Sequence, residues 1–158
     1  MKPVISIEEI EFRIIYLRHK GAYKDFRKQA SKMFKRLYSF GMSHEIVVEG
    51  VSKVLTIYDD NPYITDQDNL RTSVAFTCSN NNPVNLEDEI TEKMIHGKYA
   101  VVHLNLSPKE YKEAWENVYR DWITQEEYTL RDAPPFEMYL EEPSSKEQRN
   151  VDFYIPIQ

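Results

Sequence analysis

Glutamate and tyrosine alternate with apolar residues in short strand-like segments, a pattern that could bind an organic cation. Neighbours on a strand point to opposite faces, so Glu137 and Tyr139 share one face of the predicted strand 136–140. The aliphatic residues of this strand and of predicted strands 54–58 and 151–155 should face the helices. The other face then carries Glu137, Tyr139, Asp152, Tyr154 and Tyr58. A carboxylate among rings is costly unless neutralised, and a bound cation would gain roughly 0.5–2 kcal/mol of cation–π attraction from each tyrosine face.

Two interpretations of Glu137 require no ligand. An antiparallel sheet often leaves one face in water, so the polar face could simply be exposed. Glu137 could also form a salt bridge with a neighbour on the sheet such as Arg71. A third interpretation is catalytic, because burial beside rings raises the pKa of a carboxyl group and would suit it to activating water or protonating a substrate.

Other familiar chemistry is disfavoured by residue type and spacing. The four histidines show no metal-ligand spacing, and one cysteine makes a zinc site or an internal disulfide improbable. The four glycines are scattered, so no phosphate-binding loop is expected. Cys78 could act as a nucleophile with His103, but a buried strand thiol is the simpler interpretation. We therefore expect neither a metal nor a cofactor.

Length and charge are typical of a single cytoplasmic domain spanning residues 1–158. No run of 18 apolar residues exists, and the first residues lack the apolar stretch of a signal peptide. Residues 1–36 hold ten Lys/Arg and four Asp/Glu, although the whole chain has a net charge of −6. The basic residues lie mainly on a predicted helix, at Lys24, Arg27, Lys28, Lys32, Lys35 and Arg36. This surface is either an ordinary solvated face or, over residues 24–36, a docking surface for a protein partner. The acidic remainder would repel phosphate, so no direct nucleic-acid binding is expected.

Periodicity predicts two rounds of the same elements. The first has a strand at 12–18, a helix at 22–40 that stops at Gly41, and strands at 53–59 and 70–78. Residues 43–52 are ambiguous and could hold a short helix. The second round has a strand at 99–104, a helix opened by Ser107 and Pro108, and strands at 136–140 and 151–155 that are separated by a turn at 142–146.

The two rounds match in register, which indicates an internal duplication. Phe26, Ala30, Phe34 and Leu37 superpose on Tyr111, Trp115, Tyr119 and Trp122, and Tyr58 superposes on Tyr139. We therefore predict an α+β fold made of duplicated strand–helix–strand–strand units with pseudo-twofold symmetry. It has an antiparallel sheet with helices on one face. The repeats cover about 12–79 and 98–157, with a linker at about 80–97.

Five motifs in series resemble the gyrase-inhibitor-like (GyrI-like) effector-binding domain, as found in AraC-type and MerR-type regulators and in stand-alone proteins. They are RHKGAY at 18–23, YDDNP at 58–62, GKYAV at 97–101, W-x-x-x-Y-x-x-W at 115–122 and PFE-x-Y at 135–139. The resemblance implies a ligand cleft between two lobes and binding of amphipathic, often cationic or aromatic compounds such as drugs. By motif match it implies a ligand site of Glu137, Tyr139, Trp115 and Tyr119, to which the strand pattern adds Tyr154 and Tyr58.

The resemblance also leaves other functions open. The family often has a His-x-Gly-Pro-Tyr-like turn before its second helix, whereas this chain has His103-Leu-Asn-Leu-Ser-Pro108, and an acidic residue usual near Ser73 is absent. Some stand-alone relatives hydrolyse reactive small molecules with the same glutamate. The namesake inhibits DNA gyrase, for which the basic helix could serve as a docking surface. Trp115 and Trp122 share one helix face, and we assign Trp122 to the core.

Overall fold

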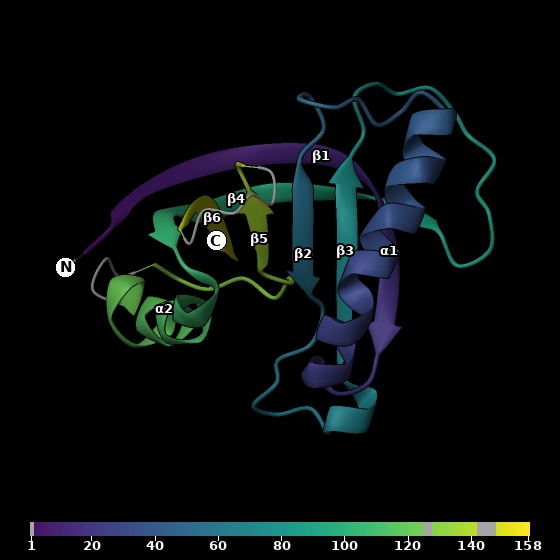
Figure 1. Cartoon of the computed structure of the whole chain (residues 1–158). Helices are drawn as coiled ribbons and strands as arrows, with labels where there is room; N and C mark the ends of the chain where they lie inside the picture. The colour runs from purple at the N-terminus through teal and green to yellow at the C-terminus, as the bar shows by residue number, and fades with distance from the viewer. Residues whose placement is uncertain (1, 125–127, 142–147) are drawn as a thin grey trace. The chain divides into compact units, whose positions relative to one another are not determined.

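The computed structural model describes residues 2–124, 128–141 and 148–158, so the predicted turn at 142–146 lies outside the described residues (Figure 1). The elements follow one another as β1 (Val4–Lys20), α1 (Tyr23–Ser43), β2 (Val54–Tyr58), β3 (Arg71–Thr77), β4 (Thr91–Leu106), α2 (Tyr111–Asn117), β5 (Phe136–Tyr139) and β6 (Arg149–Pro156). Short 3₁₀ turns occupy Gln67–Asn69 and Pro108–Glu110, and a π-helical turn at Val118–Trp122 extends α2. The predicted α+β class is confirmed.

The chain forms two compact units, each described by itself below. We call Glu11–His96 the α1 unit, and Met1–Ile10 together with Gly97–Gln158 the α2 unit. The long strands β1 and β4 each contribute residues to both units. None of the helices in the described residues has both the length and the apolarity that a membrane span needs.

In the α1 unit, β3 pairs antiparallel with both β1 and β2, and α1 packs on one face of these strands. Ile15 lies opposite Phe76, which lies opposite Val54 on the other side, so the three share a face. That face meets α1, because Ile15, Phe76 and Val54 join Phe26 and Leu37 of the helix in one apolar cluster. The core of this unit therefore lies between α1 and the strands.

The predicted helix stop at Gly41 is wrong, because α1 continues to Ser43 and buries Gly41. A Cβ atom at this position would lie 2.2 Å from Cγ2 of Val47, so only a glycine lets the following segment approach the helix so closely. Residues 44–53 form turns and extended chain rather than the short helix considered at 43–52. β1 and β4 also extend well beyond the predicted 12–18 and 99–104.

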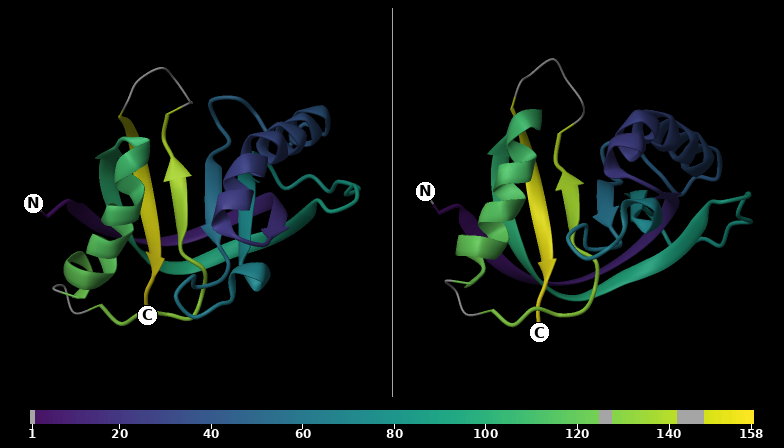
Figure 2. Two further views of the ribbon diagram at one scale, coloured as in Figure 1. Left: turned by 60° about the horizontal axis from the view of Figure 1, so that its bottom comes forward. Right: turned by 90° about the horizontal axis from the view of Figure 1, so that it is seen from below.

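In the α2 unit, β6 pairs antiparallel with both β4 and β5, and α2 lies along β6 (Figure 2). The predicted N-terminus of the helix is confirmed. Ser107 and Glu110 form a capping box at the start of the turn Pro108–Glu110 that leads into α2. The core between α2 and the strands contains Ala114 and Val118 of the helical segment, with Val102 and Phe153 of the strands.

The two units repeat the same pairing order, β1–β3–β2 in one and β4–β6–β5 in the other. The predicted strand–helix–strand–strand repetition is thus present in the fold. Ile15 pairs with Phe76 in the α1 unit as Ala100 pairs with Ile155 in the α2 unit. Matched positions can therefore be compared one by one.

Candidate functional site

Glu137 lies on the face of β5 that meets α2. In the register between β5 and β6, Glu137 is opposite Phe153 and Tyr139 is opposite Val151, and directly opposed residues share a face. Phe153 and Val151 belong to the apolar cluster under α2. The strand pairing therefore carries the carboxylate and Tyr139 toward the helix.

The predicted sheet faces need correction in two strands. Tyr58, Glu137 and Tyr139 lie on the helix-facing sides of their units, whereas Asp152 and Tyr154 lie on the opposite side, as expected. The prediction assumed that the more aliphatic face must meet the helix. Here both faces are buried: Leu55, Ile57, Phe136 and Met138 are at most 4% exposed on the side away from the helix. Parity alone cannot then decide which face the helix covers.

Two neutral donors hold the buried carboxylate. Trp115 Nε1 donates to Glu137 Oε2 and the Tyr139 hydroxyl donates to Glu137 Oε1, both at 2.7 Å. Glu137 is only 2% exposed. The indole N–H and the phenol O–H both donate, so each carboxyl oxygen of Glu137 accepts one hydrogen bond. Such charge-assisted bonds are short and fix the carboxylate in place.

A stack of aromatic rings from α2 and β6 supports the indole. The Trp115 ring lies on Phe153 with centroids 4.1 Å apart and planes 5° apart. Tyr119 stacks on Trp115 at 6.1 Å, and Tyr111 contacts Phe153 at 6.0 Å. Tyr119 is 41% exposed, yet burial around its ring raises its pKa to about 12, so its hydroxyl remains a neutral donor at physiological pH. The stack places one exposed ring beside the indole that binds Glu137.

Tyr154 is separated from this arrangement by the pleat of β6. Its ring stacks on Phe136, with centroids 4.5 Å apart, and its hydroxyl lies 3.7 Å from the Met138 sulfur. Burial raises the pKa of Tyr154, and the nearby Glu8 and Asp152 carboxylates raise it further. Of the six predicted site residues, the structure brings Glu137, Tyr139, Trp115 and Tyr119 together, while Tyr154 lies on the other face.

Tyr58 belongs to the α1 unit, where it faces α1 and contacts Tyr23 with ring centroids 6.2 Å apart. It occupies the position that Tyr139 occupies in the other repeat. By the same comparison, Thr56 takes the place of Glu137 and Ala30 takes that of Trp115. The carboxylate–indole pair is therefore present in one repeat only.

Arg71 has a different partner from the one considered in the salt-bridge interpretation of Glu137. Its guanidinium binds Asp60 through two hydrogen bonds of 2.8 and 2.9 Å. The hydrogen bond from Arg71 holds the pKa of Asp60 below its usual value. This pair links the segment after β2 to the start of β3, which gives Asp60 of the YDDNP motif a structural role.

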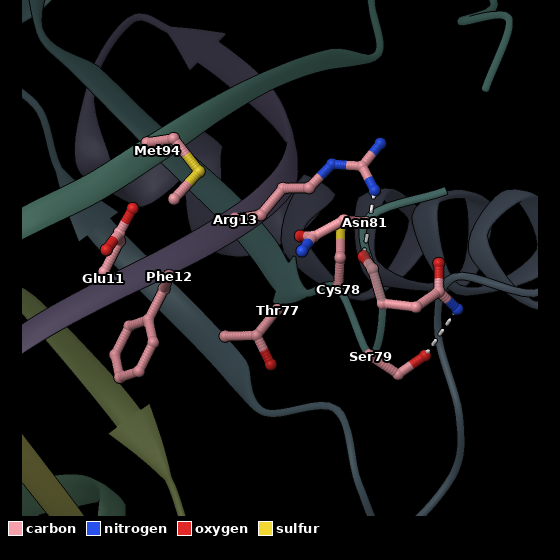
Figure 3. Close-up of a pocket in the computed structure, with 9 residues that line it drawn as sticks. Glu11, Phe12, Arg13, Thr77, Cys78, Ser79, Asn81 and Met94 are labelled. Carbon is pink, nitrogen blue, oxygen red and sulfur yellow. Dashed lines mark hydrogen bonds between the residues drawn. The ribbon is translucent and has the colours of Figure 1, made fainter. Parts of the chain in front are cut away.

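A hollow of about 430 Å³ in the α1 unit carries none of the predicted site residues (Figure 3). Polar groups form much of its lining, and the Arg13 guanidinium is bound to Glu92 and to the carbonyl oxygen of Asn80. Cys78 lines it as well, and burial raises the pKa of this thiol, which disfavours the reactive thiolate. The considered pairing of Cys78 with His103 has no support, because the two His103 nitrogens contact Asp152 and Ser6.

Phe153 is the site residue that the sequence did not identify. Alternation along 151–155 puts it on the face expected to meet the helix, without marking it as part of the site. It is fully buried, and the Trp115 ring lies on it. The register that sets Phe153 opposite Glu137 would have revealed it. Trp122 was assigned to the core, and it does pack against the apolar cluster of the α2 unit.

Comparison with known families gives one match across the chain. The profile described as "GyrI-like small molecule binding domain" matches residues 3–158. YosT, a prophage-derived protein of Bacillus subtilis, is 30% identical over 98% of this chain and 99% of its own length. A DNA gyrase inhibitor of Yersinia enterocolitica is 26% identical over 96% of this chain and 95% of its own.

Solved structures with the same fold include two with matches over almost the whole chain. The C-terminal domain of EcmrR aligns with a TM-score of 0.77 over 100% of this chain and 99% of that one, at 14% identity. SAV2435, solved bound to tetraphenylphosphonium, aligns with a TM-score of 0.63 over 98% and 94% of the two chains, at 13% identity. At these identities the likeness concerns the fold.

Proposed function

This chain belongs to the GyrI-like small molecule binding family, and on that premise we propose that it binds amphipathic organic cations through Glu137 in the cytoplasm. The family match supports small-molecule binding as such. The observation that carries the finer proposal is the buried carboxylate of Glu137, held by the Trp115 indole and the Tyr139 hydroxyl. SAV2435, which shares the fold, was solved with a lipophilic cation.

The chemistry of the α2 unit favours a cation over an anion or a neutral ligand. Trp115 and Tyr139 fix the Glu137 carboxylate through donors that are themselves neutral, and an approaching cation would be attracted to its negative charge. The Tyr119 ring, exposed and stacked on Trp115, offers a π face on which a cation gains roughly 0.5–2 kcal/mol. Removing both charges from water offsets much of their attraction, so apolar contact with the rings should supply most of the affinity. The predicted position of the ligand between two lobes stays a prediction.

Calorimetry with matched ligands tests this proposal. We expect tetraphenylphosphonium to bind with a dissociation constant near micromolar, or about −8 kcal/mol. Triphenylphosphine oxide, which has similar rings and no net charge, should bind at least 10-fold more weakly. Equal affinities, or no binding of either compound, would contradict the cationic-ligand proposal. Chromatography of the same mixtures, extended to reactive small molecules, shows whether this site also hydrolyses its ligand, as the glutamate-based alternative requires.

The basic helix supports a second proposal, a protein partner with an acidic surface. Lys24, Arg27, Lys28, Lys32, Lys35 and Arg36 are all exposed on α1, and Arg36 pairs with Glu89 and with the carbonyl oxygen of Asp88. The Yersinia relative is named a DNA gyrase inhibitor. Reversing two charges, Lys28→Glu with Lys32→Glu, should weaken any inhibition of gyrase supercoiling by about 10-fold. The neutral change Gln29→Ala on the same helix should have no effect, and lack of inhibition by the unaltered protein would dismiss this partner.

A further inference from the structure

Three polar side chains of the α2 unit form a hydrogen-bonded chain on the sheet face away from α2. Ser6 Oγ lies 2.9 Å from His103 Nε2, and His103 Nδ1 lies 2.8 Å from Asp152 Oδ1. The register between β4 and β6 sets His103 directly opposite Asp152, and Ser6 comes from the first part of β1. The His103 side chain is 40% exposed, whereas that of Asp152 is 10% exposed. A nucleophile, a base and a group that orients the base are thus in order, with the base open to solvent.

The hydrogen bond between Asp152 and His103 Nδ1 determines whether His103 Nε2 donates or accepts. An ionised carboxylate can only accept, so the neutral ring carries its proton on Nδ1 and directs it at Asp152. Nε2 then carries no proton, and its lone pair accepts a hydrogen bond from the Ser6 hydroxyl. This is the arrangement in which a histidine can take the proton of a serine as that serine attacks.

We propose that Ser6, His103 and Asp152 form a hydrolytic site for short, uncharged carboxylic esters, separate from the Glu137 site. The two sites use adjacent residues of β6 that point to opposite faces: Phe153 supports Trp115, and Asp152 orients His103. Ser6 and His103 are the catalytic residues, and Asp152 is a positioning residue.

The fold itself does not require these side chains. In the α1 repeat, the positions of His103 and Asp152 are taken by Arg18 and Ser73, which also lie opposite each other on their strands. The sheet therefore accommodates other polar pairs at this register. The trio is particular to the α2 unit, as is the carboxylate–indole pair.

Amide donors lie next to the trio. Asn105 is opposite Asn150, one step along the same face from the His103–Asp152 pair, which is about 7 Å on an extended strand. The Asn105 amide donates to the Asn150 side-chain oxygen at 3.0 Å, and both residues are exposed. These side chains extend the polar surface of this sheet face beyond the trio.

The reaction consumes one water per ester. Ser6 Oγ bonds to the carbonyl carbon while its proton passes to His103 Nε2, and the carbon–alkoxy bond breaks as the leaving alcohol takes that proton. Water then attacks the acyl-serine, giving its proton to Nε2, and the serine regains a proton as the carboxylic acid departs. Asp152 keeps its charge throughout and stabilises the imidazolium in each half of the cycle.

Charge and exposure define the substrate class. Glu8, two residues after Ser6, points to the same side of β1, and with Asp152 it adds a second carboxylate near the site. Anionic esters would be repelled. The exposed His103 offers little apolar enclosure for a long chain, so short acyl groups with good leaving groups fit best.

Covalent labelling tests the site in the unaltered protein. A fluorophosphonate probe should add one label, and peptide mapping should locate it on Ser6. Hydrolysis of p-nitrophenyl acetate should fall about 100-fold or more in both Ser6→Ala and His103→Asn. The matched changes Ser31→Ala and His96→Asn alter an exposed serine and an exposed histidine elsewhere and should leave the rate unchanged. A label on another residue, no label, or full activity in Ser6→Ala would overturn the proposal.

The test of Asp152 must distinguish a role in orienting His103 from a role in stabilising the fold. Asp152→Asn should lower kcat at least 10-fold with little change in KM, and should shift the pH dependence of labelling, because an asparagine can stabilise the wrong tautomer. Asp152→Glu should restore part of the rate. A lower melting temperature with unchanged kcat and pH profile would show a purely structural role and remove Asp152 from the site.

Discussion

Changing Glu137 to glutamine is expected to weaken the binding of tetraphenylphosphonium about 30-fold or more. Glutamine has nearly the same shape, so the stack of Phe153, Trp115 and Tyr119 can stay in place. The change removes the charge and replaces one accepting oxygen with an amide donor, which then faces the indole N–H or the tyrosine hydroxyl. Truncating one partner of a buried charge pair costs about 2 kcal/mol or more, which corresponds to this loss in affinity. Isothermal calorimetry measures it directly.

The control for this change is Glu116→Gln, which removes an exposed carboxylate next to Trp115 in α2. It alters the net charge by the same amount but leaves the buried site intact, so affinity should change less than about 3-fold. Binding of triphenylphosphine oxide should be nearly insensitive to both variants. If Glu137→Gln and Glu116→Gln behave alike, Glu137 is a structural residue and the proposed cation site is wrong.

Changing Phe153 to alanine is expected to lower the free energy of unfolding by about 3–5 kcal/mol. The side chain is fully buried, belongs to the core under α2, and carries the Trp115 ring at 4.1 Å. For a chain of this size the melting temperature should fall by roughly 6–20 °C, which thermal unfolding followed by circular dichroism would detect. The loss should extend to the ligand site, because Trp115 would no longer be fixed against Glu137.

Phe136→Ala provides a matched comparison on the other side of the sheet. Phe136 is also fully buried, but it stacks on Tyr154, on the sheet face opposite to the one that carries Phe153. We expect a similar loss of stability, with Trp115 fluorescence and ligand affinity retained below the melting point. Both variants should be made in a protein that also carries Trp122→Phe, so that the tryptophan fluorescence comes from Trp115 alone. Equal loss of affinity in the two variants would contradict a special role for Phe153.

Local patterns predicted the elements well because each rests on neighbouring residues. The helix register that matched Trp115 with Ala30, and the cap formed by Ser107, depend on spacing within a few residues. The order of elements in the two repeats follows from the same local signals. The motif match named Trp115, Tyr119 and Glu137 together. In the structure Tyr119 and Glu137 both contact the Trp115 indole.

Long-range contacts were not predictable in the same way. The face of β5 that meets the helix depends on register and on burial of both sheet faces, neither of which alternation reveals. Gly41 was predicted to end the helix, because its close contact with Val47 cannot be seen in the sequence. Ser6 and His103 are 97 residues apart, and nothing in their local sequence indicates a contact.

Because β1 and β4 are divided between the two units, one unit is completely synthesised before the other. The α1 unit is one continuous stretch, Glu11–His96, whereas the α2 unit needs both Met1–Ile10 and Gly97–Gln158. A ribosome adds roughly 5–20 residues each second, so residues 97–158 take about 3–12 s to synthesise after His96. During that interval the first strand carries an unpaired end, which a chaperone could bind. Ser6 and Trp115 can therefore meet their partners only after the α1 unit has been synthesised.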